Sequence, residues 1–174
     1  MLYDWFGYKI FPNFRCCEYW CQVLERNSEY TKMSKFAGKW KFVSHDNIEE
    51  ILRAKGMDED FIAKSRDDKP TMIITFSDNT IHLKTEGWTW NFDDSLTLDV
   101  CSEHNLPTGE TYQVTVTKES DTRMKAVFTG TVNPGHAVHE ICGNQLHVTS
   151  TTGGVTSKSI FVKVCDLRTR SSDL

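Results

Sequence analysis

The sequence predicts a closed antiparallel β-barrel with a pair of short helices at one end. Two observations carry this prediction. From residue 71 to residue 164, short segments that alternate apolar and polar side chains recur between turn-forming residues, as is typical of a β-sandwich or an up-and-down barrel. Before these segments, and after one initial strand-like segment, the apolar residues change to helical spacing. Closure of the sheet removes exposed edges that promote aggregation, so we favour a barrel.

The first strand is expected over residues 36–43, where apolar and polar side chains alternate. A helix is expected next, because Asp46 or Asn47 can cap its first turn. Gly56 can end this helix in a left-handed turn. The apolar face of the helix consists of three residues at helical spacing: Ile48, Ile51 and Leu52.

A second short helix is expected to begin near residues 58–60. The three carboxylates there favour the positive N-terminal end of a helix, and Phe61 and Ile62 supply an apolar contact. Pro70 ends the segment, because proline lacks the backbone donor that a helix interior requires. A helix pair inserted directly after the first strand is placed to cap one open end of a barrel and to act as a gate.

The rest of the chain is predicted to be β-structure. Strands are expected over residues 71–76, 80–85, 88–92, 95–100, 111–117, 124–130, 137–141, 145–151 and 159–164. Turn-forming clusters separate these segments, and residues 77–79 (Ser-Asp-Asn) are typical of a hairpin connection. A barrel of eight to ten strands is wide enough to hold one small ligand.

The chain of 174 residues has room for one ordinary domain. We expect the barrel domain over residues 33–166, a disordered or loosely attached N-terminal extension over residues 1–32, and a C-terminal tail over residues 167–174. The extension is rich in aromatic residues and lacks the uninterrupted apolar stretch of a signal peptide or membrane span. An alternative interpretation of the extension is membrane attachment, through acyl chains on Cys16, Cys17 and Cys21.

Composition and motifs argue against several function classes. A formal net charge of −4 gives no general attraction to nucleic-acid phosphates. No glycine-rich phosphate loop, nucleophile elbow or dinucleotide fingerprint occurs, so we expect no enzyme, no catalytic residues and no cofactor. His136 and His139 lie three apart on a predicted strand and therefore face opposite sides, so we expect no metal site.

Irregularly spaced cysteines and the lack of an Asn-x-Ser/Thr acceptor favour a cytoplasmic location.

Four segments together resemble the intracellular lipid-binding proteins, the calycin family that includes the fatty-acid- and retinoid-binding proteins. They are the Gly-x-Trp segment at residues 36–43, the helical segment ending in Lys69-Pro70, residues 86–91 and residues 154–161. The resemblance covers about residues 34–166 in order. It implies a ten-stranded barrel around a hydrated cavity, a portal under the helices, and non-covalent intracellular transport of a small hydrophobic ligand by a monomer.

The resemblance also implies candidate binding positions, matched residue by residue to the lid, the strands facing the cavity and the loops beside the entrance. The candidate ligand-binding residues are Ile48, Leu52, Met57, Met72, Thr85, Thr89, Thr108, His139, Val148, Ser150, Ser159 and Phe161. Gly87, Pro107 and Glu110 match neighbouring positions. For the apolar members, ordinary core packing is the alternative interpretation.

The chain departs from the family at the positions that bind a carboxylate. Many fatty-acid binders use an Arg-x-Tyr in the last strand and another arginine two strands earlier; here these positions are Ser159, Phe161 and His139. A buried carboxylate without a cationic partner is costly, and burial disfavours a charged histidine. We therefore expect a neutral ligand, such as a retinol-like alcohol, a sterol-like lipid, an acyl ester or a monoacylglycerol, or a fatty acid whose carboxylate lies toward the portal.

Other interpretations remain open at this point. One is a secreted lipocalin-like binder, against which the helix pair and the lack of a signal segment count. Another is an interaction module whose barrel is filled by its own side chains. A basic patch of Lys64, Arg66 and Lys69 would suit transient membrane contact during ligand transfer, but surrounding carboxylates favour an ordinary solvated surface.

Overall fold

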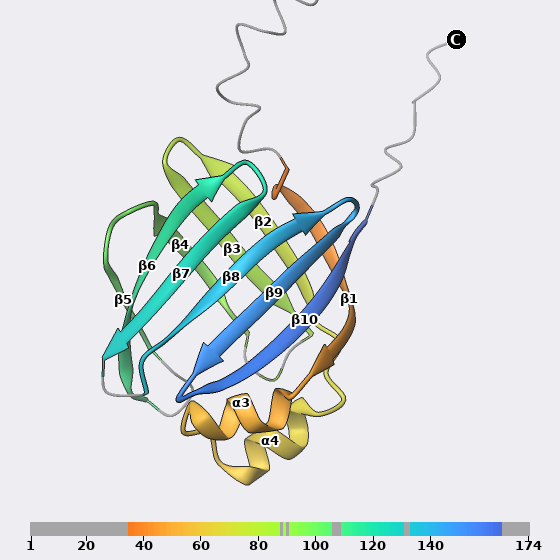
Figure 1. Cartoon of the computed structure of the whole chain (residues 1–174), viewed down its shortest axis with the longest axis vertical. Coiled ribbons are helices and arrows are strands. Elements are labelled where there is room, and N and C mark those ends of the chain that lie inside the picture. The colour runs from red at the N-terminus through yellow and green to blue at the C-terminus, as the bar shows by residue number, and fades with distance from the viewer. Residues whose placement is uncertain (1–34, 88, 90, 106–108, 131–132, 165–174) are drawn as a thin grey trace, which may run out of the picture. The chain divides into compact units, whose positions relative to one another are not determined.

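The computed structural model describes residues 35–87, 89, 91–105, 109–130 and 133–164. The N-terminal extension and the C-terminal tail expected from the sequence lie outside these residues. The described chain forms ten strands and two helices (Figure 1). In order they are β1 (Gly38–Asp46), α3 (Ile48–Ala54), α4 (Glu59–Ser65), β2 (Thr71–Ser77), β3 (Thr80–Glu86), β4 (Asp93–Thr97), β5 (Ser102–Asn105), β6 (Thr111–Ser120), β7 (Arg123–Gly130), β8 (Gly135–Cys142), β9 (Gln145–Thr152) and β10 (Val155–Val164).

The strands form one antiparallel sheet in the order β4-β3-β2-β1-β10-β9-β8-β7-β6-β5. β2 to β4 and β5 to β10 pair in sequence as hairpins, and β1 pairs with β2 across the intervening helix pair. The ladder between β1 and β10 rolls the sheet up, with Lys39 opposite Val164. No backbone ladder joins β4 to β5 among the described residues. The structure is therefore the nearly closed, ten-stranded up-and-down barrel that the sequence predicts.

Two strand predictions need correction. The predicted strand at residues 88–92 is absent at the described positions, where Thr89, Asn91 and Phe92 are in no strand. The sequence reading also missed β5, because its four residues, Ser-Glu-His-Asn, are all polar and give no alternation. β5 forms by pairing with the longer β6, and only His104 within it is buried. Tertiary pairing, not local pattern, makes this short edge strand.

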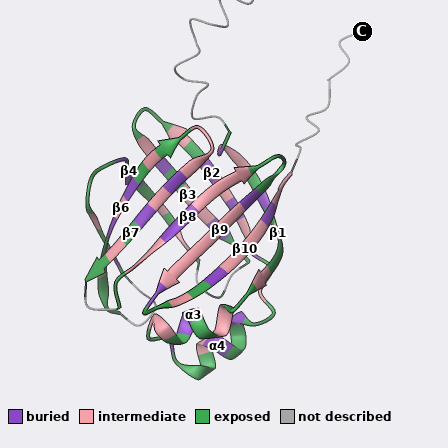
Figure 2. Ribbon diagram, in the orientation of Figure 1, coloured by how far each residue is buried: buried purple, intermediate pink, exposed green. Residues whose placement is uncertain are grey.

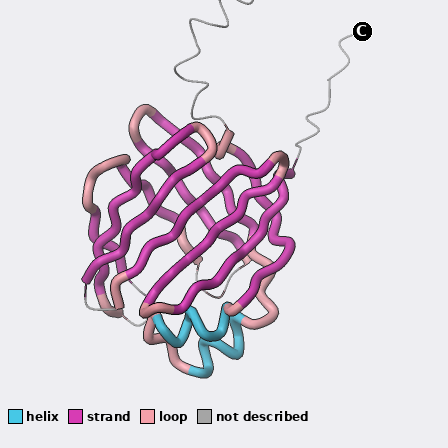
Figure 3. The backbone as a smooth tube through the Cα atoms, viewed as in Figure 1, coloured by secondary structure: helices cyan, strands magenta, loops and turns pink. Residues whose placement is uncertain are grey.

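The two helices lie at one end of the barrel, where β1 ends (Figures 1 and 3). Asn47 precedes α3 with a left-handed backbone, and its side chain donates to the Thr156 carbonyl instead of capping the helix (3.2 Å). Asp58 caps α4 by accepting the Phe61 backbone N–H at 2.7 Å. Gly56 between the helices has φ of 81°, as the sequence predicts for a left-handed turn. None of the helices in the described ranges is both long enough and apolar enough to cross a membrane.

Buried hydrophobic residues form two separate clusters. Figure 2 colours buried positions purple along the ribbon. The larger lines the barrel and includes Trp40, which is fully buried and donates from Nε1 to the Phe36 carbonyl at 2.8 Å. Because Phe36 lies just before β1 and Trp40 lies near its start, they close the barrel at the end opposite the helices. The smaller cluster holds the helix pair together through Leu52, Met57 and Ile62.

Candidate functional site

The barrel and the helix pair enclose a cavity of about 260 Å³. A single water needs roughly 10–15 Å³, so this space is far larger than a packing defect. Its wall is mostly apolar and is built from both helices and most of the strands. This hollow interior contradicts the alternative of a barrel filled by its own side chains.

Most of the candidate ligand-binding residues line this cavity. They are Ile48, Leu52, Met72, Thr85, His139, Val148, Ser150, Ser159 and Phe161. The strand residues among them share one face because side chains alternate along a strand. Contact of these residues with a ligand stays a prediction.

Two candidates do not line the cavity, and a third lies outside the described residues. Met57 is buried within the lid cluster, against Leu52 and Ile62, because the turn between the helices directs it into their own interface. Thr89 is exposed, and its backbone N–H donates to Asp68 Oδ2 at 2.6 Å. Thr108 lies outside the described residues. Of the neighbouring positions, Gly87 and Glu110 are exposed, and Pro107 is also outside the described residues.

A band of four side chains, three of them polar, crosses the cavity wall from β8 to β1. The registers place His139 opposite Val148, Val148 opposite Ser159, and Ser159 opposite His45. Burial lowers the pKa of His139 to about 4, so this imidazole is neutral at pH 7. Neither His139 nor Ser159 makes a side-chain hydrogen bond within the described chain. His139 and Ser159 therefore offer neutral hydrogen-bonding groups to a cavity occupant.

The described cavity wall contains no arginine and one lysine, Lys55. Lys55 directly follows α3 and was missed by the sequence reading. A signal was present, because residues 48, 51, 52 and 55 follow the i, i+3, i+4, i+7 spacing of one helix face. Lys55 is thus a cation on the otherwise apolar face of the lid.

Aromatic and polar side chains bridge the opening between β4 and β5. The Nδ1 atom of His104 on β5 contacts the carboxylate of Asp94 on β4. The His104 ring packs between Phe92 and Tyr112, with ring centroids 6.0 and 5.8 Å away. Burial, and secondarily the nearby Asp94 carboxylate, raise the pKa of Tyr112 to about 12. Phe92 and Tyr112 both line the cavity, so this bridge forms part of its wall.

The other chemistry considered from the sequence can be placed as well. Over the described residues, no group of three or more histidine, cysteine or acidic side chains is arranged to hold a metal ion. Cys101 and Cys142 are exposed free thiols outside the cavity wall. His139 lines the cavity, whereas His136 does not.

An antiparallel barrel with a helical lid and an apolar interior defines a class of proteins that enclose a small hydrophobic molecule. No family model matches the chain, but known proteins do. A fatty acid-binding protein of Clonorchis sinensis is 32% identical over 127 residues, which is 72% of this chain and 95% of that protein. Fatty acid-binding protein 1 of Fasciola gigantica is 29% identical over 137 residues, covering 75% of this chain and 99% of that protein.

Solved structures share the fold. A Schistosoma mansoni fatty acid binding protein, solved in complex with arachidonic acid, aligns with a TM-score of 0.72 at 21% identity, covering 76% of this chain and 98% of that one. The chain belongs to the fatty-acid-binding protein family, within the intracellular lipid-binding proteins. The resemblance drawn from the sequence is confirmed.

Proposed function

We propose that this protein is a non-enzymatic carrier that binds one lipid molecule reversibly in the barrel cavity. The cavity is the observation that supports the proposal, because it is mostly apolar and is lined by the barrel strands together with a separate helical lid. Burying apolar ligand surface contributes roughly 25 cal/mol per Å², from which the cost of ordering the ligand is subtracted. Relatives named as fatty acid-binding proteins support a long-chain lipid as the ligand. We propose a cytoplasmic, monomeric carrier.

The lid provides the gate. Asn47 holds the start of α3 to the Thr156 carbonyl, and Asn133 Nδ2 holds its end by donating to the Ala54 carbonyl at 2.8 Å. α3 packs against β9 and β10, whereas α4 is fastened mainly to α3. We therefore expect the ligand to pass on the α4 side of the lid, by a gating motion and without a chemical step.

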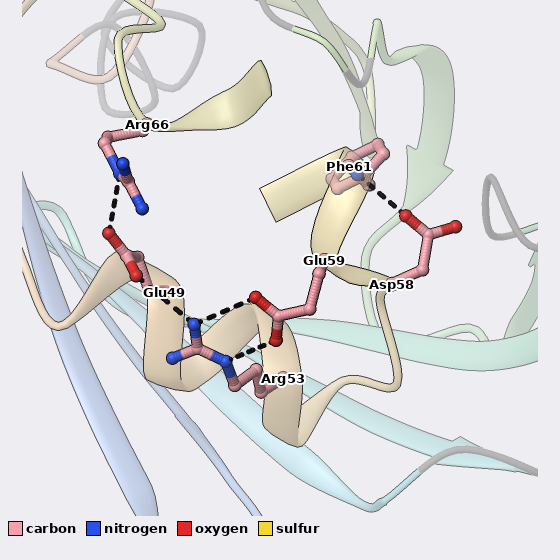
Figure 4. A network of polar contacts seen from close by, with 6 residues as sticks. All are labelled: Glu49, Arg53, Asp58, Glu59, Phe61 and Arg66. Atoms are coloured by element: carbon pink, nitrogen blue, oxygen red, sulfur yellow. Dashed lines mark hydrogen bonds and ion pairs between the residues drawn. The ribbon is translucent and has the colours of Figure 1, made fainter. Parts of the chain in front are cut away.

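Ion pairs fasten α4 to α3 (Figure 4). Arg53 Nε lies 2.7 Å from Glu59 Oε1, and Arg66 Nε lies 2.8 Å from Glu49 Oε1. These pairs are at the surface, where solvent screens the charges and each pair contributes little to stability. They orient α4 and yet permit it to separate from α3 at small cost.

Transfer of the ligand by diffusion is the proposal that the lid surface supports best. Of the three cations in the basic patch, Arg66 is engaged by Glu49, which leaves Lys64 and Lys69 for an anionic membrane. We expect the transfer rate to vesicles to be insensitive to vesicle concentration and to salt. A rate that rises with anionic vesicles and falls with salt would instead establish collisional transfer.

The carrier proposal is tested by filling the cavity. Ala126 on β7 lines the cavity, and the adjacent Val127 is 40% exposed on the outer face. Ala126→Phe should abolish displacement of a fluorescent fatty acid analogue, while Val127→Phe, the matched control, should bind like the natural protein. Mass spectrometry of lipid extracted from the purified protein would identify the cargo. Equal binding by both variants would overturn the proposal.

A further inference from the structure

Lys55 reaches the cavity because of where α3 ends. It follows Ala54, the last residue of α3, and still has helical backbone angles (φ −83°, ψ 0°). Its side chain therefore continues the face formed by Ile48, Ile51 and Leu52, all of which line the cavity with it. A lysine at this position places its ammonium group at the inner surface of the lid.

The ammonium group has no counter-charge within the part of the chain that the structure describes. Within the described part of the chain, no carboxylate oxygen lies within 4.0 Å of the Lys55 ammonium group. Asp68, the acidic residue of the cavity wall, instead accepts the Thr89 backbone N–H. Lys55 lines the cavity, and desolvation by burial lowers its pKa. A desolvated, unpaired cation is costly, and such groups are concentrated at functional sites.

Lys55 is held at a defined place at the lid end of the cavity. The carbonyl of the preceding residue, Ala54, accepts the Asn133 hydrogen bond at 2.8 Å. A Cβ at Gly153, in the turn between β9 and β10, would lie 3.6 Å from the Ala54 Cβ. The end of α3 is thus fixed against both neighbouring connections. The opposite end of the barrel is closed by Phe36 and Trp40, which are apolar and fully buried.

We propose that Lys55 binds the carboxylate of a long-chain fatty acid at the lid end of the cavity, with the acyl tail directed toward the Trp40 end. The inference rests on the proposed carrier function and names its ligand class and orientation. A single ammonium group matches a single negative charge, whereas a phosphate is usually held by arginines or several donors. The deeper polar band, with neutral His139 and Ser159, supplies no cation for a carboxylate placed further inside.

The test compares three ligands of one chain length: a fatty acid, its methyl ester and the corresponding alcohol. Each is measured by displacement of a fluorescent lipid from the natural protein, Lys55→Met and Lys55→Arg. We expect the natural protein and Lys55→Arg to prefer the acid, and Lys55→Met to lose about tenfold in affinity for the acid alone. Lys64→Met, which removes an exposed lysine from the same lid, should behave like the natural protein.

The outcomes separate this inference from the carrier function. Unchanged affinity of the alcohol shows that Lys55→Met still folds and still encloses a lipid. If Lys55→Met keeps the acid preference, or if His139→Gln abolishes that preference instead, the assignment to Lys55 is overturned while the carrier function stands. If no ligand displaces the probe from the natural protein, the carrier function itself fails.

Discussion

The imidazole of His104 on β5 contacts the carboxylate of Asp94 on β4, across the two strands that share no backbone ladder among the described residues. The His104 side chain is 7% exposed and that of Asp94 is 40% exposed. Ser102 Oγ lies 2.9 Å from the second ring nitrogen of His104, so both nitrogens have a polar partner. Side-chain contacts therefore join β4 to β5, whereas backbone hydrogen bonds join the other neighbouring strands of the barrel.

We expect Asp94→Asn to destabilise the protein by about 1–2 kcal/mol, because it removes the charged partner of a buried imidazole. The measurement is urea unfolding at pH 7. Asp93→Asn is the matched control, since Asp93 makes only surface pairs with His82 at 3.2 Å and Lys84 at 3.6 Å. Its effect should stay within about 0.5 kcal/mol. Equal effects of the two substitutions would show that the bridge adds nothing to stability.

His139 should make the protein less stable as the pH falls from 6.5 toward 4. Burial lowers its folded-state pKa to about 4 from an ordinary value of 6.5, so between these values the unfolded chain binds the extra proton. The resulting loss of stability is roughly 3 kcal/mol at pH 4, and it vanishes above pH 6.5.

His139→Gln should therefore flatten the dependence of unfolding free energy on pH in this window. His136→Gln, on the same strand but outside the cavity wall, serves as the control and should leave the slope unchanged. A slope that survives in His139→Gln would mean that the histidine is solvated in the folded protein.

Ser65→Ala should leave stability unchanged or raise it by up to about 1 kcal/mol. The Ser65 hydroxyl is buried in α4 and has no hydrogen-bond partner within the described chain, so its removal relieves an uncompensated desolvation cost. Ser157 is equally buried, but its hydroxyl donates to the Asp46 carbonyl at 2.6 Å. Ser157→Ala should accordingly cost about 1–2 kcal/mol by thermal unfolding. The reverse order of the two variants would contradict the hydrogen-bond assignment.

Asn133→Ala should accelerate ligand release, because it frees the end of α3 from the barrel. Loss of the hydrogen bond to the Ala54 carbonyl removes about 1 kcal/mol from the closed lid, equivalent to a rise of about fivefold in the release rate. Stopped-flow dilution of a fluorescent lipid complex measures this rate. Asn79→Ala is the control. Asn79 lies in the turn between β2 and β3, away from the lid, and its side chain donates to the Leu98 carbonyl. Similar acceleration in both variants would argue against a tether specific to α3.

The barrel and its lid were predictable because each depends on a sequence period. The family resemblance assigned Met72, His139 and Val148 to inward-facing positions, and the structure has all three on the cavity wall, as alternation along the long strands allows. The turn between the helices has no such period, and the orientation of Met57 depends on packing that only the folded lid provides. Lys55 lies on the same predicted helix face as Ile48, Ile51 and Leu52. It was missed because that face was identified from its apolar residues alone.

The pairing of β1 with β10 also bears on how the chain can be reconnected. Lys39 lies opposite Val164, so the start of the first strand and the end of the last are neighbours, while β4 and β5 share no ladder. A circularly permuted protein, with the first and last strands linked and a new break at the exposed residues Val100 and Cys101, would keep every strand pairing. The order of its strands along the chain would then be the order of the sheet itself, from one open edge to the other.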